Sequence, residues 1–156
     1  MAEGNKNWQG VAGKFAKQLQ YEKEFISAPF IQYSESVPTV LQTTGFEQAR
    51  YFNASDTTDP WKAYIVAKPN PGDLIKINHS MGFWIGNGAI VGKSFTVAGI
   101  VPGQTQLTLY GGWNMIGYPS IESKPVSDVL LGISYTSVEA FDPTAAPYYL
   151  KILSST

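Results

Sequence analysis

The sequence contains no cysteine and only one histidine, His79. The absence of cysteine excludes disulfides, thiolate metal sites and thiol catalysis. A single histidine excludes a two-histidine metal site, and any Ser-His-Asp triad would have to use His79. This residue lies in a predicted turn, and no Gly-x-Ser-x-Gly nucleophile motif accompanies it. We therefore expect a protein that is not an enzyme and that carries no organic cofactor.

Charged residues are also scarce, at 15% of the chain, whereas soluble domains average roughly 25%. Eleven basic and twelve acidic residues leave a net charge of −1, so no long-range field attracts nucleic acid or an anionic membrane. No stretch approaches the roughly 20 apolar residues that a membrane-spanning helix needs. We therefore expect neither nucleic-acid binding nor a membrane span.

What the chain has in abundance favours β-structure. Hydrophobic residues make up 44% of the chain and aromatic residues 13%, and there are 15 glycines. With so little charge, the polar surface must come from Ser, Thr, Asn and Gln, a composition typical of sheets joined by turns. A length of 156 residues suits one compact core. We predict a single mainly β domain over residues 1–156.

A motif occurs twice along the chain. Residues 25–30 align with residues 114–120, which places Pro29 opposite Pro119. Later segments follow in the same order: 37–41 with 124–130, 48–53 with 137–142, and 61–64 with Tyr148-Tyr149. Self-similarity of this kind indicates an internal repeat. The predicted organisation is an N-terminal arm (1–23), a first copy (24–90), connecting strands (91–110) and a second copy (111–156).

Each copy predicts a strand that ends at a proline, one short helix, and two strands of alternating apolar and polar residues. The helices are expected to begin beside Pro38 and Pro125, with four apolar residues pointing into the core: Val40, Leu41, Val129 and Leu130. The connecting strands are predicted at 94–97 and 104–110, joined by a turn at 101–103. We expect the whole to form a β-sandwich or a barrel.

The second copy lacks a closing strand. The first copy closes with residues 81–85, whereas the sequence ends at Thr156 before any equivalent. Residues 7–11 around Trp8 have the character to fill this place, and we expect them to pair beside the strand at 148–153, either within one chain or between chains. Pairing between chains would add subunits head to tail and build a polymer.

The segment Trp113-Asn114-Met115-Ile116-Gly117-Tyr118-Pro119-Ser120, together with Met81-Gly82-Phe83-Trp84-Ile85, resembles a known family. It is similar to tandem repeats of large secreted and surface proteins of bacteria and archaea, which run from a Gly-Trp-Asn-Leu-Ile-Gly-Tyr-Pro strand to a Gly-Tyr-Trp-Ile strand. The resemblance covers residues 24–156, although the first copy carries Glu24 to Ser27 where Gly-Trp-Asn would stand. It implies an extracellular module without catalytic residues, found in adhesins, hydrolases and envelope proteins.

Aromatic residues are the best candidates for binding. Trp84 and Trp113 lie in strong strand patterns and are expected to be buried, whereas Trp61 follows Asp59-Pro60 and is expected at a loop edge. Exposed aromatic rings stack on sugars or anchor protein interfaces. The candidate binding residues are Trp8, Trp61, Tyr64, Tyr148 and Tyr149.

One loop offers oxygen ligands for calcium, and two sequons offer sites for glycans. Asn53, Asp56 and Asp59 lie close together in sequence and are our candidate Ca²⁺ ligands, although the loop has neither the Gly nor the Glu of an EF-hand. Asn53 and Asn78 each begin an Asn-x-Ser sequon. A capped turn is the alternative to the calcium site.

These features together predict a non-catalytic structural or interaction module of the cell surface or of an extracellular filament. Its expected partners are other copies of itself or other envelope proteins. The alternative is a carbohydrate-binding module that uses exposed aromatic residues and takes glycans as partners. An enzyme ranks third, because one histidine and no recognisable acid–base pair leave little chemistry to build on.

Overall fold

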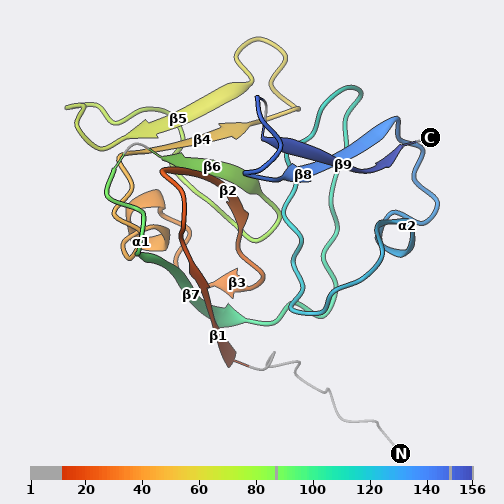
Figure 1. Ribbon diagram of the computed structural model, residues 1–156, viewed down its shortest axis with the longest axis horizontal. Coiled ribbons are helices and arrows are strands. Elements are labelled where there is room, and N and C mark those ends of the chain that lie inside the picture. The colour runs from red at the N-terminus through yellow and green to blue at the C-terminus, as the bar shows by residue number, and fades with distance from the viewer. Residues whose placement is uncertain (1–11, 87, 148, 156) are drawn as a thin grey trace, which may run out of the picture. The chain divides into compact units, whose positions relative to one another are not determined.

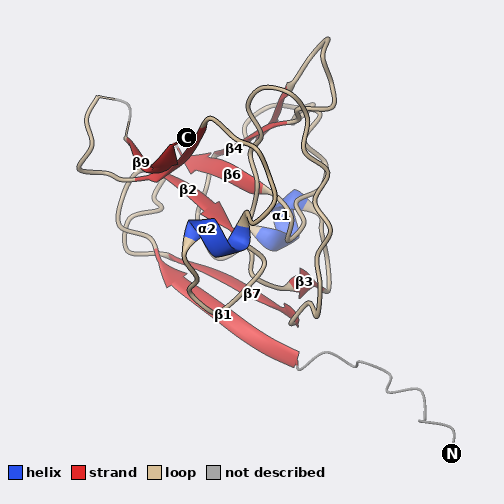
Figure 2. Ribbon diagram, turned by 90° about the vertical axis from the view of Figure 1, so that its right-hand side faces the viewer, coloured by secondary structure: helices blue, strands red, loops and turns tan. Residues whose placement is uncertain are grey.

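The computed structural model describes residues 12–86, 88–147 and 149–155. The chain divides into two compact units, Met1–Ser120 (the large unit) and Ile121–Thr156 (the small unit). All strand pairs are antiparallel, and they form three sheets (Figure 1). The two helices are four residues each, so the described chain is overwhelmingly strand and loop (Figure 2). The predicted mainly β fold with two short helices is confirmed.

The large unit contains two sheets. A three-stranded sheet has the order β1-β7-β3, and a four-stranded sheet has the order β2-β6-β4-β5. The strands of the first are β1 (Ala12–Gln18), β7 (Ser94–Ile100) and β3 (Ile31–Gln32). Those of the second are β2 (Lys23–Ser27), β6 (Gly82–Gly86), β4 (Gln48–Phe52) and β5 (Trp61–Ile65).

The core of the large unit is formed by the inward-facing residues of both sheets and of helix α1 (Val37–Val40). Phe83 of β6 and Phe95 of β7 are fully buried, and their ring centroids lie 6.2 Å apart in an edge-on arrangement. Val40 and Leu41 belong to the same cluster of buried residues. Alternation along each strand places every second side chain on this inner face, which is why the period of two in the sequence predicts the strands.

One buried charge joins the two sheets of the large unit. Glu24 of β2 is 1% exposed, and its carboxylate accepts hydrogen bonds from the backbone N–H groups of Gln20 and Tyr21 at 2.6 and 3.2 Å. The Lys17 ammonium of β1 forms an ion pair with the same carboxylate. Because a buried carboxylate needs partners of this kind, the turn between β1 and β2 is held by Glu24.

The small unit consists of helix α2 (Val126–Val129) and the strands β8 (Ser137–Phe141) and β9 (Leu150–Ser155). The two strands form a hairpin with an irregularity between Val138 and Glu139. None of the described side chains of this unit is fully buried. The small unit therefore has no closed core among its described residues.

Four details of the sequence-based predictions are wrong. Residues 104–110 form no strand and pair with none of the described strands. Val129 is 42% exposed, because no further strand covers the hairpin beside it. Trp113 is 62% exposed, because it lies in a turn rather than in a strand. Finally, none of the three sheets closes into a barrel within the described residues.

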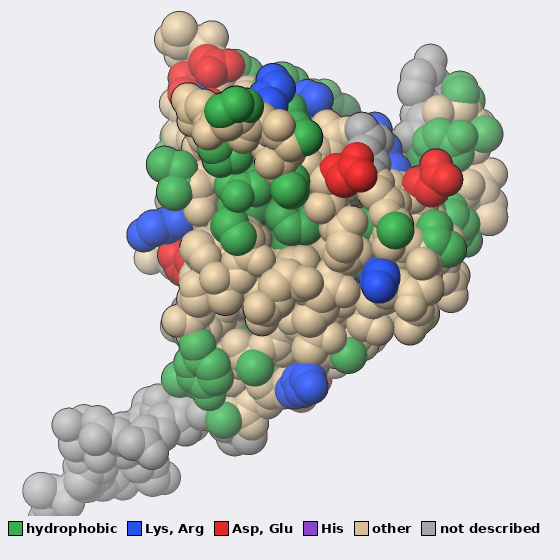
Figure 3. All heavy atoms as spheres, turned by 90° about the vertical axis from the view of Figure 1, so that its left-hand side faces the viewer, with side chains coloured by type: hydrophobic (Ala, Val, Ile, Leu, Met, Phe, Trp, Pro, Cys, Tyr) green, Lys and Arg blue, Asp and Glu red, His purple; other side chains and the backbone are tan. Residues whose placement is uncertain are grey.

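The surface carries few charges. Most of the face seen in Figure 3 is uncharged, as a composition with 15% charged residues predicts. Within the described part of the chain, no helix is long and apolar enough to cross a membrane.

Candidate functional site

The β4–β5 hairpin of the large unit is part of a wider sheet. Strand β4 pairs with β5 on one edge and with β6 on the other, where Ala49 lies opposite Ile85 and Arg50 opposite Trp84. The outer edge of β5 is also occupied. The Ala63 N–H donates to the Asp73 carboxylate at 2.9 Å, and the Ala63 carbonyl accepts the Leu74 N–H at 3.0 Å. No stretch of hydrogen-bonding groups is therefore left open across this hairpin.

The β8–β9 hairpin of the small unit differs, because β8 is paired on one edge only. Its partner is β9, and no other described strand lies beside it. A strand edge of this kind presents unpaired N–H and C=O groups and is a template for another strand. We call this edge of β8, over residues 137–140 and with respect to the described strands, the free edge of β8.

Apolar side chains of the small unit are widely exposed. Leu131 is 86% exposed, Ile121 64% and Ile152 61%. Five more large apolar residues are at least 39% exposed: Val129, Ile133, Tyr149, Leu150 and Leu153. An exposed apolar surface of this extent is typical of a site that another chain covers.

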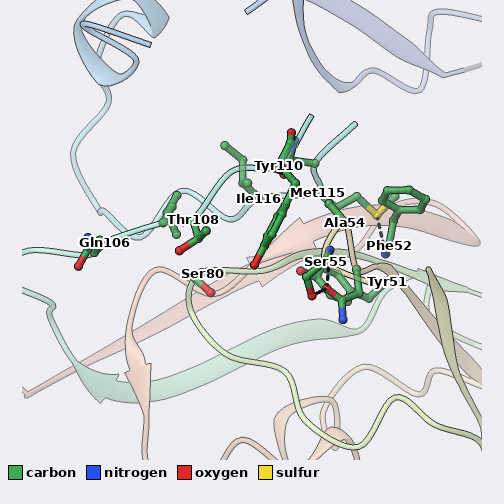
Figure 4. Close-up of a pocket in the computed structure, with 13 residues that line it drawn as sticks. Tyr51, Phe52, Ala54, Ser55, Ser80, Gln106, Thr108, Tyr110, Met115 and Ile116 are labelled. Carbon is green, nitrogen blue, oxygen red and sulfur yellow. Dashed lines mark hydrogen bonds between the residues drawn. The ribbon is translucent and has the colours of Figure 1, made fainter. Parts of the chain in front are cut away.

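The large unit has a recess of about 300 Å³ between β4 with the loop after it, the segment before β6 and the segment after β7 (Figure 4). Thirteen residues line it and none of them is charged. Tyr51 and Tyr110 supply the phenol rings, and Ser80, Gln106 and Thr108 supply polar groups. The recess therefore suits an uncharged polar ligand.

Hydrogen bonds from neighbouring backbone shape this recess. The Asn114 side chain accepts the Tyr110 N–H at 3.0 Å and donates to the Tyr110 carbonyl at 2.8 Å, which closes the turn at 110–114. The Phe52 N–H donates to the Met115 sulfur at 3.2 Å. Burial, and next the nearby Tyr110, raise the pKa of Tyr51 above its usual value, so its hydroxyl stays protonated and neutral.

The structure describes three of the five aromatic residues predicted to bind a partner or a glycan. Trp61 is 51% exposed, as expected, and its ring meets Phe52 edge-on with centroids 5.3 Å apart. Tyr64 is half-buried against the core and contacts Phe46, on the opposite face of β5 from Trp61. Tyr149 is 48% exposed in the small unit. Trp8 and Tyr148 lie outside the described residues.

The side chain of Lys62 lies among the carboxylates of the candidate calcium loop. The Lys62 ammonium lies 2.9 Å from a carboxylate oxygen of Asp56 and 3.4 Å from one each of Asp59 and Asp73. Hydrogen bonds from the Asp59 N–H and from Lys62 lower the pKa of Asp56 to about 2. Among the described residues no three His, Asp or Glu side chains form a cluster that suits a metal ion. The lysine thus supplies positive charge among the oxygens that the calcium prediction used.

The two sequon asparagines adopt the same local turn. Oδ1 of Asn53 accepts both the N–H and the hydroxyl of Ser55, at 3.2 and 2.7 Å. Oδ1 of Asn78 accepts the same two groups of Ser80, at 2.9 and 2.6 Å. Both asparagines are half-buried. Glycosylation at these positions stays a prediction.

The free edge of β8 and the recess at Tyr51 and Tyr110 are the two candidate sites that the structure brings out. The recess was not predicted from the sequence, because residues distant in sequence form it. Comparisons of the chain with protein-family models, with curated proteins and with solved structures find no match. What the chain does must therefore be inferred from its own residues and their geometry.

Proposed function

We propose that the chain is a non-catalytic structural module of the cell surface or of an extracellular filament, and that it binds a neighbour through the free edge of β8. The observation that carries this proposal is that no other described strand pairs with residues 137–140 of β8, in a unit whose apolar side chains are exposed. The extracellular location is supported by the resemblance of residues 113–120 to repeats of secreted and surface proteins.

Backbone hydrogen bonds support the inference that the small unit is an incomplete second copy. In β4 and its loop, the Asn53 N–H donates to Pro60 at 2.7 Å, and the Asp142 N–H after β8 donates to Tyr149 at 2.9 Å. Asp142 then accepts the N–H and hydroxyl of Thr144 just as Asn53 accepts those of its own turn. The same number of sequence positions separates Asn53 from Asp142 and Pro60 from Tyr149.

Corresponding residues of the two helices are separated by the same number of sequence positions. The Leu41 N–H donates to Val37 at 3.0 Å, and the Leu130 N–H donates to Val126 at 2.9 Å. Their burial differs, however. Leu41 is fully buried and Leu130 only half-buried. In the large unit β6 pairs with β4 beside this region. In the small unit no described strand takes the corresponding place beside β8.

The size of the small unit supports the same proposal. Units below about 40 residues usually need disulfides, a metal or association to be stable. The chain has no cysteine, and its described residues hold no metal-ligand cluster. Association is one means of stabilising a unit of this size.

The absence of catalysis is supported by the environment of the only histidine. Nδ1 of His79 is buried without a hydrogen-bond partner among the described residues, so no carboxylate orients the ring through it. Burial lowers the pKa of His79, which keeps the imidazole neutral. A catalytic histidine needs both an orienting group and a proton to exchange.

A peptide with the sequence of residues 80–86 tests the proposed function. Added in excess to the full chain, it should slow amide exchange across residues 137–141 roughly tenfold or more, because each new hydrogen bond contributes about 1 kcal/mol net. Hydrogen exchange with mass spectrometry measures this protection. A peptide of the same composition in scrambled order is the control. Equal exchange with both peptides would contradict an acceptor edge on β8.

Carbohydrate binding is the second candidate, and the recess at Tyr51 and Tyr110 favours it. Uncharged polar groups beside phenol rings match the hydroxyls and the apolar ring faces of a neutral sugar. If a glycan array identifies a ligand, Tyr110→Ala should weaken its binding more than tenfold, since aromatic anchors carry much of the binding energy. Tyr33→Ala, which changes a tyrosine that is 69% exposed and does not line the recess, should leave binding unchanged. Failure to bind any glycan would remove this candidate.

A further inference from the structure

We propose that the recess at Tyr51 and Tyr110 binds one sugar of a neutral β-1,4-linked glucan and that Trp61 stacks against a later sugar of the same chain. The proposal rests on the second candidate function, carbohydrate binding, and names the class of glycan. Every residue that carries it lies in the large unit and in the described part of the chain.

Phe52 joins the recess to Trp61. It lines the recess, and in the pairing of β4 with β5 it lies directly opposite Trp61. Opposed residues of antiparallel strands project from the same face of a sheet, and here the two ring centroids lie 5.3 Å apart. The aromatic surface therefore continues from the recess across β4 to β5.

Met115 lies between Phe52 and Tyr110 (Figure 4). Its sulfur accepts the Phe52 N–H at 3.2 Å, beyond Arg50, the last residue of β4 that pairs with β6. Apolar groups thus follow one another from Tyr110 through Met115 and Phe52 to Trp61. Both ends of this line are accessible to a ligand, since Tyr110 is 46% and Trp61 51% exposed.

A line of apolar groups suits a ligand that repeats along its length. Aromatic rings stack on the apolar C–H faces of sugars, and β-linked glucose, whose ring substituents are equatorial, offers such a face on both sides of its ring. A β-1,4 linkage joins these rings into an extended chain that presents one face after another. A single glucose would occupy the recess alone, whereas a chain of several would also reach Trp61.

The polar groups of the recess suit the hydroxyls of a neutral sugar. Ser80, Gln106 and Thr108 supply donors and acceptors, and none of the lining residues is charged. Lys62, the residue after Trp61, projects from the other face of β5 and is paired with Asp56 at 2.9 Å. An acidic sugar in the recess would therefore lose water without gaining a cationic partner there.

Titration of the full chain with glucose, cellobiose and cellotetraose tests this proposal. Calorimetry, with NMR chemical shifts for the weakest ligand, gives the three dissociation constants. Cellotetraose should bind at least tenfold more tightly than glucose, because it adds an aromatic contact at Trp61 to those in the recess. Cellobiose should fall between the two.

Substitutions of Trp61 locate the second contact. Trp61→Ala should bring the affinities for cellotetraose and glucose to within about threefold of each other, and Trp61→Tyr, which retains a stacking ring, should keep most of the difference. Tyr33→Ala is the matched control, since Tyr33 is 69% exposed and does not line the recess, and it should leave the difference unchanged. Far-ultraviolet circular dichroism checks that each variant is folded.

The opposite outcomes separate this proposal from the function on which it rests. Equal affinities for glucose and cellotetraose, or a preference for cellotetraose that survives Trp61→Ala, would overturn the contact at Trp61 and leave the recess as a sugar site. If none of the three glucosides binds but the glycan array identifies another ligand, the glucan is wrong and carbohydrate binding stands. If no glycan of the array binds, both fall together.

Discussion

Replacing Glu24 with alanine is expected to lower the unfolding free energy of the large unit by about 3 kcal/mol, because a buried ion pair is broken and its partners are left. The carboxylate is 1% exposed and accepts the N–H groups of Gln20 and Tyr21 in addition to Lys17. After the substitution these two N–H groups lose their acceptor in a region that is partly closed to water.

Urea denaturation followed by tryptophan fluorescence measures this effect. All four tryptophans precede residue 121, so the signal reports on the large unit. Glu22→Ala is the control: this glutamate lies two positions away, is exposed, and should change stability by no more than about 0.5 kcal/mol. Glu24→Gln should fall between the two, since it retains an acceptor but loses the charge. Equal stabilities of Glu24→Ala and Glu22→Ala would show that Glu24 does not hold the turn.

Replacing Phe83 with alanine is expected to destabilise the large unit by about 3–5 kcal/mol. Phe83 is fully buried on β6 and contacts Phe95 of the other sheet. The substitution leaves a cavity in addition to removing apolar contact area, and a well-packed core relaxes only partly around it. Because Phe83 lies on the closing strand, its loss also imitates the uncovered state of the small unit.

Leu131→Ala provides the comparison for Phe83→Ala. Leu131 belongs to the small unit and is 86% exposed, so its removal should change the stability of the isolated chain by no more than about 0.5 kcal/mol. The same urea titration, with far-ultraviolet circular dichroism added to observe both units, measures the two variants. A small effect of Phe83→Ala would contradict the role of β6 as the cover of the core.

A strand bound beside β8 would take the place in the small unit that β6 takes beside β4 in the large unit. In the large unit the closing strand belongs to the same chain, so that core is complete in the described structure. In the small unit no other described strand pairs with the β8–β9 hairpin, and a strand supplied by another chain would make its stability depend on protein concentration. A surface module built in this way would be most stable when assembled.

Several parts of the fold could be predicted from the sequence because they depend on local chemistry. The alternation of Ala49 with Tyr51, and of Val138 with Ala140, predicted β4 and β8, since side chains alternate between the two faces of a strand. Pro38 and Pro125 correctly indicated where the two helices begin, because proline suits the first turn of a helix.

Other parts were decided only by the tertiary structure, because they depend on which strand edges are already occupied. Residues 104–110 have a strand-like composition but pair with none of the described strands. The partners of Glu24 and the recess between Tyr51 and Tyr110 likewise join residues that no local pattern relates. The sequence by itself determined the mainly β character and the short elements, whereas pairing across long separations determined the cores and the candidate sites.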